Sequence, residues 1–407
     1  MQWTTHRNER GFILATALIA MVVVGAAVVA GYFVANQEFH VGKSVRESMA
    51  SFYTGQAGLQ REFANWPIAQ RWTMQGGQTI NVGPVTLPNG TAYRGTITRV
   101  DNVPESDTDS ERYYVVSLTG IAPAPLIGQE VRSRQAMFLR VRYYDFCCTA
   151  AITAKDTVVQ AGSTEIDGNN NEPLTWAGQC DSVDNSAVAG AEVECSTCYV
   201  SEGTQDSQSG DPAIEVDTTL QPQSLTEWEE VNFEFLASKA QKVYAPGATA
   251  SPTVPVTNPD PITALPVCDE TVKNNWGEPT DPLHDCFDYF PTIYGEGDLL
   301  LEGNTYGQGM LIVEGNLFVK GSYRFYGIIL VKGHLILEGT SATGGPKIIG
   351  SAIVAGQTAP GDSITNSRIA GDAAIQYSAC AVSRAKRFAE LARKQPLPLR
   401  SWTEALN

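Results

Sequence analysis

One uncharged stretch near the N-terminus limits what this chain can fold into. From Gly11 to Ala35 no side chain is charged, and Thr16 is the one polar residue apart from the Tyr32 hydroxyl. A helix rises about 1.5 Å per residue, so this stretch extends roughly 37 Å, more than the roughly 30 Å hydrocarbon core of a bilayer. The apolar region of a secretory signal peptide is shorter, about 7–15 residues. The stretch therefore predicts a helix held in a membrane.

A short polar leader that carries Arg7 and Arg10 stands immediately before the apolar stretch. A charged leader, then Gly11, then an uncharged run that starts at Phe12 resembles the prepilin leader of type IV pilins and pseudopilins. The resemblance implies that a prepilin peptidase cleaves between Gly11 and Phe12 and that the new Phe12 amine is methylated. A plain, uncleaved signal anchor is the alternative that these residues leave open.

Two further features narrow the resemblance to the PilX-type minor pilins. Most pilins carry Glu at the fifth position of the mature chain, where this chain has Thr16; variants without that Glu occur among PilX-type minor pilins and tip pseudopilins. The segment Ala50-Ser-Phe-Tyr-Thr-Gly-Gln-Ala-Gly-Leu59 resembles the block that follows the apolar run in PilX-type proteins, with Gln56 where Glu is commoner. The resemblance implies a minor pilin or pilus assembly protein, with the inner membrane and other pilin subunits as partners.

The helical pattern continues past the membrane stretch as far as Pro67. Residues 12–67 are predicted to form one helix, in which Thr16, Gly25 and Gly31 lie in the membrane or filament part. An apolar stripe is expected to dock the rest of the helix on its own domain; it consists of Val45, Met49, Phe52, Leu59, Phe63 and Trp66. Residues 68–150 then alternate apolar and polar side chains as antiparallel strands do, which is the layout of a pilin.

A second organised unit is predicted over residues 294–378 from the spacing of glycine. The second and fourth residues after each glycine are mostly apolar, which suits a short strand followed by a corner, and so a β-solenoid. A meander of very short hairpins is the alternative. The region resembles the C-terminal domain of many PilX-type pilus assembly proteins, and similar strands occur in bactofilins. The glycines recur every six residues, at 297, 303, 309, 315, 321, 327, 333, 339 and 345.

The segments around this unit give weaker signals. Residues 151–244 are predicted to be an irregular β-rich region with one helix, and residues 245–293 a Pro-rich extended linker. Residues 379–407 are predicted to be a helix and tail that cap the open end of the solenoid. Asp167, Asn169 and Asn171 offer oxygen ligands for Ca²⁺, but Asn/Gly runs are usually plain turns, so the calcium site is a weak candidate.

All the cysteines follow the apolar stretch. An even number in an exported segment is typical of disulfides formed in an oxidising compartment, although the pairing cannot be deduced from sequence. One CxxC motif, Cys195-Ser-Thr-Cys198, does not make a zinc site, and no metal is expected. The eight disulfide candidates are Cys147, Cys148, Cys180, Cys195, Cys198, Cys268, Cys286 and Cys380.

Composition and motifs argue against several classes of function. A formal net charge of −16, without a Lys/Arg cluster, argues against nucleic acid as a partner. The sequence contains no phosphate-binding loop, nucleophile elbow or zinc-protease motif. His284-Asp285-Cys286 are neighbours in sequence, which is not how catalytic triads are assembled, so Cys286 is interpreted as a disulfide partner. Neither a cofactor nor an enzymatic activity is expected.

The sequence therefore predicts an α+β protein with a long N-terminal transmembrane helix, a small antiparallel region and a C-terminal β-solenoid. The predicted function is a minor pilin-like subunit of a type IV pilus or related secretion filament, with the solenoid serving priming, tip or adhesive roles toward an unknown surface ligand. Before assembly it would sit in the inner membrane with most of the chain periplasmic or extracellular, and afterwards in the pilus. The alternatives are a membrane-anchored adhesin, a bactofilin-like scaffold and, less favoured, a carbohydrate-active enzyme.

Overall fold

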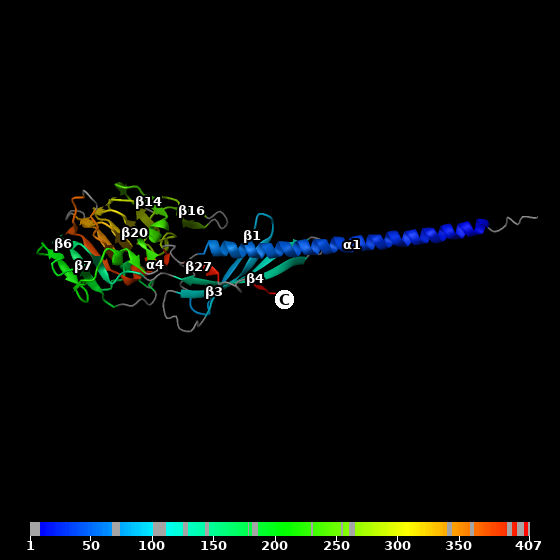
Figure 1. Cartoon of the computed structure of the whole chain (residues 1–407), viewed down its shortest axis with the longest axis horizontal. Coiled ribbons are helices and arrows are strands. Elements are labelled where there is room, and N and C mark those ends of the chain that lie inside the picture. Colours follow the sequence, from blue (N-terminus) through cyan, green and yellow to red (C-terminus); the bar gives the residue numbers. More distant parts are fainter. Residues whose placement is uncertain are drawn as a thin grey trace, which may run out of the picture.

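The chain forms a long helix, an antiparallel sheet beside its C-terminal half, and a larger β-rich body beyond the sheet (Figure 1). The class is α+β. The computed structural model describes residues 9–66, 74–100, 111–124, 129–142, 146–177, 179–180, 186–228, 231–253, 255–259, 265–339, 344–358, 362–388, 393–396 and 403–405.

A first core lies between helix α1 and the antiparallel sheet. Side chains of the last of four consecutive strands alternate, so that Met137, Leu139 and Val141 are buried while Arg132 and Arg134 are exposed. This alternation is typical of a sheet with one buried face. The elements are α1 (Glu9–Ala64), β1 (Thr79–Thr86), β2 (Ala92–Arg99), β3 (Glu111–Ala124) and β4 (Gln129–Arg142), with the strands in the order β1-β2-β3-β4.

Helix α1 approaches the sheet through small residues. Ser51, Thr54, Gly55 and Gly58 are buried at the spacing of one helical face. On the sheet side, a Cβ added to Gly120 of β3 would lie 2.0 Å from the Ser51 carbonyl oxygen and 2.4 Å from the Gly55 nitrogen. The backbones of helix and strand therefore lie too close together for a side chain at this contact.

This close approach corrects the docking stripe predicted from the sequence. Leu59 and Trp66 are buried as expected, but Val45 is 48% exposed and Met49 is 55% exposed. Bulky side chains would hold the helix away from Gly120, so the contact face consists mainly of small residues. The first half of the predicted stripe faces away from the sheet.

The rest of the described chain forms mostly parallel sheets, here called the parallel β region. One sheet has eleven described strands, in the order β10-β7-β26-β24-β22-β20-β18-β14 with β5, β8 and β11 attached, and another has seven, in the order β15-β19-β21-β23-β25-β6-β9. The strands are β5 (Ala150–Ala154), β6 (Thr157–Gly162), β7 (Glu165–Asp167), β8 (Ala189–Val193), β9 (Tyr199–Ser201), β10 (Ser207–Ser209), β11 (Ile214–Val216), β14 (Lys242–Tyr244), β15 (Ala248–Ala250), β18 (Thr292–Gly295), β19 (Leu299–Glu302), β20 (Tyr306–Val313), β21 (Leu317–Lys320), β22 (Arg324–Val331), β23 (Leu335–Glu338), β24 (Lys347–Val354), β25 (Asn366–Gly371) and β26 (Ala374–Tyr377).

Pairing between successive strands repeats at a fixed spacing in the middle of this region. Leu299 pairs with Leu317 and Leu317 with Leu335, and hydrogen bonds between equivalent corner residues likewise span 18 residues. The spacing is longer in later pairs, where Gly327 pairs with Gly350, Ile336 with Arg368 and Lys347 with Ala374. The strand pairing therefore recurs every 18 residues in this part, which is three times the six-residue glycine period predicted from the sequence.

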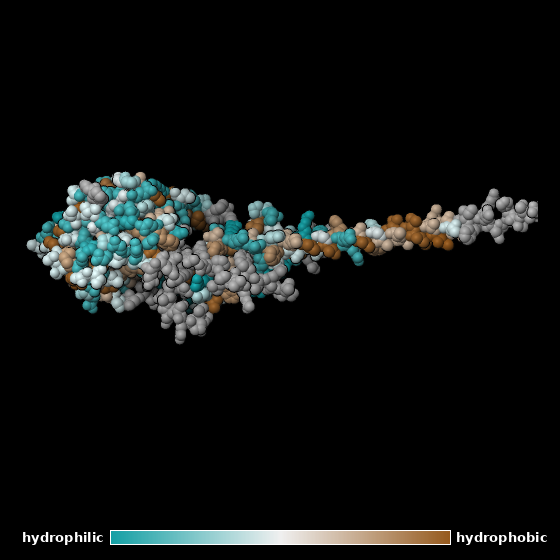
Figure 2. Space-filling view, in the orientation of Figure 1, coloured by the Kyte–Doolittle hydropathy of each residue, from teal (hydrophilic) through white to brown (hydrophobic). Residues whose placement is uncertain are grey.

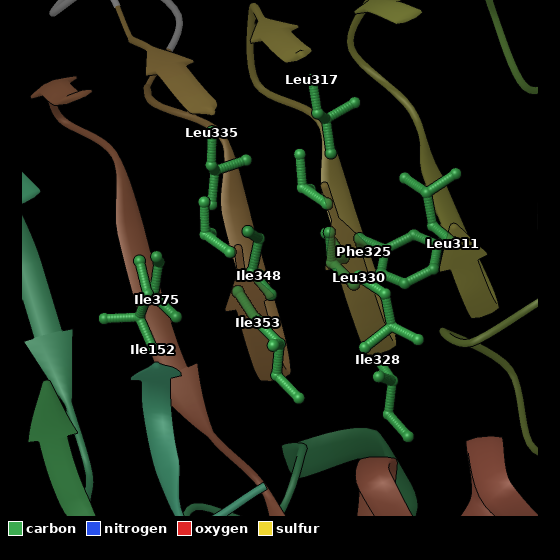
Figure 3. Packing of buried hydrophobic residues seen from close by; sticks show 14 of the residues in the cluster. Ile152, Leu311, Leu317, Phe325, Ile328, Leu330, Leu335, Ile348, Ile353 and Ile375 are labelled. Carbon is green, nitrogen blue, oxygen red and sulfur yellow. The ribbon is translucent and has the colours of Figure 1, made fainter. Parts of the chain in front are cut away.

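The second core fills the space between these parallel strands. Leu299, Leu317 and Leu335 are fully buried at paired positions of β19, β21 and β23, so each covers the next. Figure 3 shows labelled side chains at paired positions of neighbouring strands, Phe325, Ile348 and Ile375, following one another through this core. Burying each such side chain contributes about 1.5–3 kcal/mol, so the stack supplies a large share of the stability.

Shorter elements connect or cover the sheets. Two of them are hairpins, two are single-turn 3₁₀ helices, and helix α4 packs on β20, β22 and β24. They are Leu174–Trp176, Gln223–Leu225, β12 (Glu227–Trp228), β13 (Val231–Asn232), α3 (Phe233–Ser238), β16 (Thr257–Pro259), β17 (Pro266–Cys268), α4 (Ala379–Phe388), β27 (Arg393–Pro396) and β28 (Thr403–Ala405).

The strand pairing differs from three of the predicted segments. Residues 151–244 are not a separate region, because β5, β6 and β7 pair with β24, β25 and β26. Residues 245–293 are not an extended linker: β15 joins the seven-stranded sheet, and Trp276 is fully buried, with its indole N–H donating to the Tyr244 hydroxyl. The Pro- and Thr-rich composition of residues 245–293 gives no sign of this strand or of the buried Trp276 side chain.

The predicted C-terminal cap is the third difference. Helix α4 does pack on the parallel β region, but β27 and β28 leave it and pair antiparallel with β4. The free edge of β4 has unpaired backbone donors and acceptors to offer, and the returning strands satisfy them. The parallel β region is therefore an insertion between β4 and the end of the antiparallel sheet.

We expect Gly120→Ala to destabilise the first core by about 1–3 kcal/mol, because the new methyl group must displace the α1 backbone. The measurement is hydrogen exchange of the β3 amides in the full chain. Gly42→Ala is the matched control: an added Cβ at Gly42 meets nothing within 4 Å, so about 1 kcal/mol of helix propensity is gained instead. Unchanged exchange in Gly120→Ala would mean that α1 shifts off the sheet at little cost.

Candidate functional site

The N-terminal half of α1 is the most unusual surface of this protein. Its large apolar side chains from Leu14 to Val34 are each between 55% and 76% exposed. Figure 2 shows them as a continuous hydrophobic run that projects away from the rest of the molecule. In the described part of the chain this is the one helix long and apolar enough to cross a membrane. Leaving so many such side chains in water is costly, so the surface requires a covering partner.

The residues predicted from the pilin resemblance fall on this helix. Gly11 and Phe12 lie within the helical backbone of α1, and their side chains and the leader before Glu9 are outside the described residues. Thr16 is exposed. Gly25 and Gly31 are exposed too, and a Cβ at either would meet nothing within 4 Å, so neither is needed for packing within this chain.

The eight cysteines form four pairs at disulfide distance. Two bonds link neighbours in sequence, Cys147–Cys148 and Cys195–Cys198. Cys268–Cys286 cross-links the segment that the sequence predicted to be a linker. Cys180–Cys380 joins positions 200 residues apart. The Cys286 amide donates to the His284 ring (3.0 Å) while its sulfur is bonded to Cys268, so these neighbours do not form a nucleophile site.

The candidate calcium ligands do come together. Asp167 is 8% exposed, and its carboxylate accepts hydrogen bonds from the Asn169 side chain (2.8 Å), the Asn171 side chain (2.6 Å) and the Ser209 hydroxyl (2.6 Å). Burial raises the pKa of this carboxyl, but the hydrogen bonds outweigh it and hold the pKa below the usual value. The amide groups turn their N–H donors toward the carboxylate, so the arrangement is a hydrogen-bonded turn.

One buried polar cluster was not predicted from the sequence. The His334 ring lies 2.6 Å from Asp156 through Nδ1 and 3.0 Å from the Thr358 hydroxyl through Nε2, and Ser367 donates to the same Asp156 oxygen. His334 and Asp156 are 178 residues apart, so no local motif marks them. Their side chains are only 1% and 4% exposed, which suits a group that fastens the loop at Thr358 to the stack. Among the described residues no group of three or more His, Cys, Asp and Glu side chains could hold a metal ion.

Comparison with known proteins adds little to this geometry. No family model matches the chain, and no curated protein matches it. Among solved structures, the chain is similar to the competence-associated pilin ComZ from Thermus thermophilus, with 13% sequence identity and a TM-score of 0.26. That alignment covers 88% of this chain and 98% of the other. A TM-score this low does not support an argument about fold or function.

We expect Asp167→Asn to destabilise the parallel β region by about 1–3 kcal/mol at neutral pH, because an amide cannot accept all the hydrogen bonds that the carboxylate accepts. The folded pKa is lowered, so the wild-type contribution is present above the unfolded value of about 3.9 and is lost as the pH falls through the folded value. Thermal unfolding measured from pH 7 down to pH 2 should show this acid-dependent loss in the wild type and a smaller one in the variant.

Asp217→Asn provides a comparison, since that carboxylate also has a lowered pKa but is hydrogen-bonded, among the described residues, to Thr219 alone. Its effect should be smaller. A rise in the unfolding temperature of the wild type on adding Ca²⁺, absent in Asp167→Asn, would contradict the hydrogen-bonded turn and restore the calcium site.

Proposed function

We propose that this chain is a minor pilin-like structural subunit of a type IV pilus or a related secretion filament. The observation that carries the proposal is the division of α1 into two halves. The C-terminal half is packed on its own sheet through Ser51, Gly55 and Gly58, whereas the N-terminal half exposes nearly every apolar side chain. A helix of this kind suits a lipid bilayer before assembly and the helices of other subunits afterwards.

Processing by a prepilin peptidase is part of the proposal. The leader carries Arg7, Glu9 and Arg10 next to the apolar run. Moving these charges into an apolar filament interior would cost far more than is tolerable, so assembly requires that the chain be cut between Gly11 and Phe12. With Thr16 in place of the usual carboxylate, the subunit cannot pair that side chain with a neighbour's amine, and a tip or priming position accommodates this best.

The parallel β region is, in this proposal, a β-solenoid presented outside the filament for priming, tip or adhesive roles. Strand pairing at a spacing of 18 residues supports this, since three corners of six residues would complete one turn. The insertion between β4 and β27 supports it as well, because the pilin-like sheet is completed by β27 and β28 wherever the solenoid points. The proposed role is structural, without enzymatic activity, and most of the chain would lie on the periplasmic or outer side of the inner membrane.

A membrane-anchored surface adhesin is the competing function. It needs the same exposed apolar helix but neither a processed N-terminus nor other pilin subunits. The state of the N-terminus therefore separates the two functions.

We expect mass spectrometry of the protein isolated from its native cells to find a chain that begins at Phe12 and carries a methyl group on its amine. Gly11→Val should leave the leader uncut and keep the protein out of filaments while leaving its level in the membrane unchanged. Gly42→Val is the matched control, since an added Cβ at Gly42 meets nothing within 4 Å and the residue lies beyond the apolar run and far from the cut. A mature chain that still begins at Met1, or one cut after Ala35, would falsify the pilin function.

A further inference from the structure

Among the described residues, few contacts join the two cores. The antiparallel core and the core of the parallel β region are separate clusters, and among the described residues no strand of one packs extensively on a strand of the other. The chain passes from the first core to the second between β4 and β5, and it returns between α4 and β27. The polypeptide chain therefore connects the two bodies at these two crossings.

The outward crossing is anchored by Phe146. Its ring is 4% exposed in the second core, and its centroid lies 5.2 Å from that of Trp228. Lys386, near the end of α4, donates to the Cys147 carbonyl oxygen (3.4 Å) and lies 5.6 Å from the centre of the Phe146 ring. Lys386 thus links the end of α4 to the segment at Phe146 and Cys147 with which the described part of the second body begins.

The backbone at this point takes a conformation that side chains disfavour. Cys147 has φ = 64° and Cys148 has φ = 87°, and among the described residues these are the non-glycine positions with positive φ. An L-residue in this region brings its Cβ close to a carbonyl oxygen, which is unfavourable. Two such residues in succession turn the chain between the Phe146 anchor and β5.

The bond between the two cysteine sulfurs holds this turn in place. Cys147 and Cys148 form a disulfide across the peptide bond they share, and their Cα atoms are 3.7 Å apart. Without the bond, both residues would be free to return to negative φ. Both are half-buried, whereas Cys268–Cys286 and Cys180–Cys380 each join one half-buried cysteine to one buried cysteine.

We propose that Cys147–Cys148 is a redox modification site whose state controls how rigidly the parallel β region is held on the antiparallel domain. A dithiol reductant, of the kind that thioredoxin-like proteins carry, supplies two electrons and two protons. The S–S bond breaks, two thiols form, and the reductant becomes a disulfide. The turn then relaxes, Phe146 loses its fixed position, and the two bodies move more freely about the crossings. The oxidised form is the rigid one.

The first experiment measures the order in which the disulfides open. The full chain in detergent is treated with increasing dithiothreitol, the thiols that appear are alkylated, and peptides are assigned by mass spectrometry. Cys147 and Cys148 should be alkylated at lower reductant concentration than Cys268, Cys286, Cys180 and Cys380. If they open together with or after these two pairs, selective modification at this site is excluded.

The second experiment measures what opening does. At the lowest dithiothreitol concentration that reduces Cys147–Cys148, hydrogen exchange of the amides of residues 146–150 should accelerate by about tenfold or more, because both cysteines can then leave the positive-φ conformation. Exchange of the β20 and β22 amides should be unchanged. Fluorophores attached through non-cysteine chemistry at Glu130 and Glu215 should report a broader distance distribution between the two bodies. Unchanged exchange and an unchanged distribution would overturn the proposal.

Variants separate the disulfide from the backbone conformation. Replacing both cysteines by alanine should reproduce the reduced state under oxidising conditions. Replacing both by glycine should accelerate exchange less, because glycine accepts positive φ without the Cβ penalty. Cys195→Ser with Cys198→Ser is the matched control, since it removes another short-range disulfide, in the segment between β8 and β9, and should leave the exchange of residues 146–150 unchanged. If the alanine variant exchanges as slowly as the oxidised wild type, the bond does not hold the turn.

Discussion

Glycine stacked on glycine across parallel strands is the contact on which most of this structure depends. A Cβ added to Gly350 would lie 1.9 Å from the Gly327 carbonyl oxygen, and one added to Gly327 would lie 2.1 Å from that of Gly309. No side chain fits at these contacts, so Gly309, Gly327 and Gly350 align with one another where β20, β22 and β24 pair. A slip of one residue would break the column and also turn the apolar side chains out of the core. Backbone clearance therefore selects the register, and burial of leucine and isoleucine stabilises it.

The sequence could predict the parts of this fold that rest on local spacing. Regular glycines and alternating apolar residues indicate stacked short strands after Tyr294, and an absence of charge indicates the N-terminal helix. It could not predict that Ile152 pairs beside Ala352, because nothing local records a contact between residues so distant in the chain. The same holds for the return of β27 to β4, since a few basic and proline residues carry no strand signal. Pairing of distant edges is decided by which edges remain open, and that depends on the whole assembly of strands.

In the candidate site, too, features set by local sequence could be predicted, whereas contacts between distant segments could not. The exposed half of α1 follows from composition alone, whereas its docking face did not follow from the apolar stripe. Where two backbones touch, as at Gly55 and Gly120, the best side chain is the smallest, and hydrophobic periodicity does not register it. Cys180 and Cys380 are far apart in sequence, so their pairing was equally beyond prediction. Asp167 and its asparagine partners were correctly singled out as a cluster, but the direction of the amide groups is visible only in the structure.

The two bodies differ in how far they depend on molecules outside the chain. The parallel β region buries its own apolar residues and closes its core with α4, so its stability is set within the chain. The antiparallel core is small, and the helix that builds it continues into a surface that no described part of the chain covers. Substitutions in the core of the parallel β region should therefore act through folding. Substitutions between Leu14 and Val34 should leave folding unchanged and act through whatever surrounds the helix. Because the described residues form few contacts between the bodies, stability and assembly can change almost independently of each other.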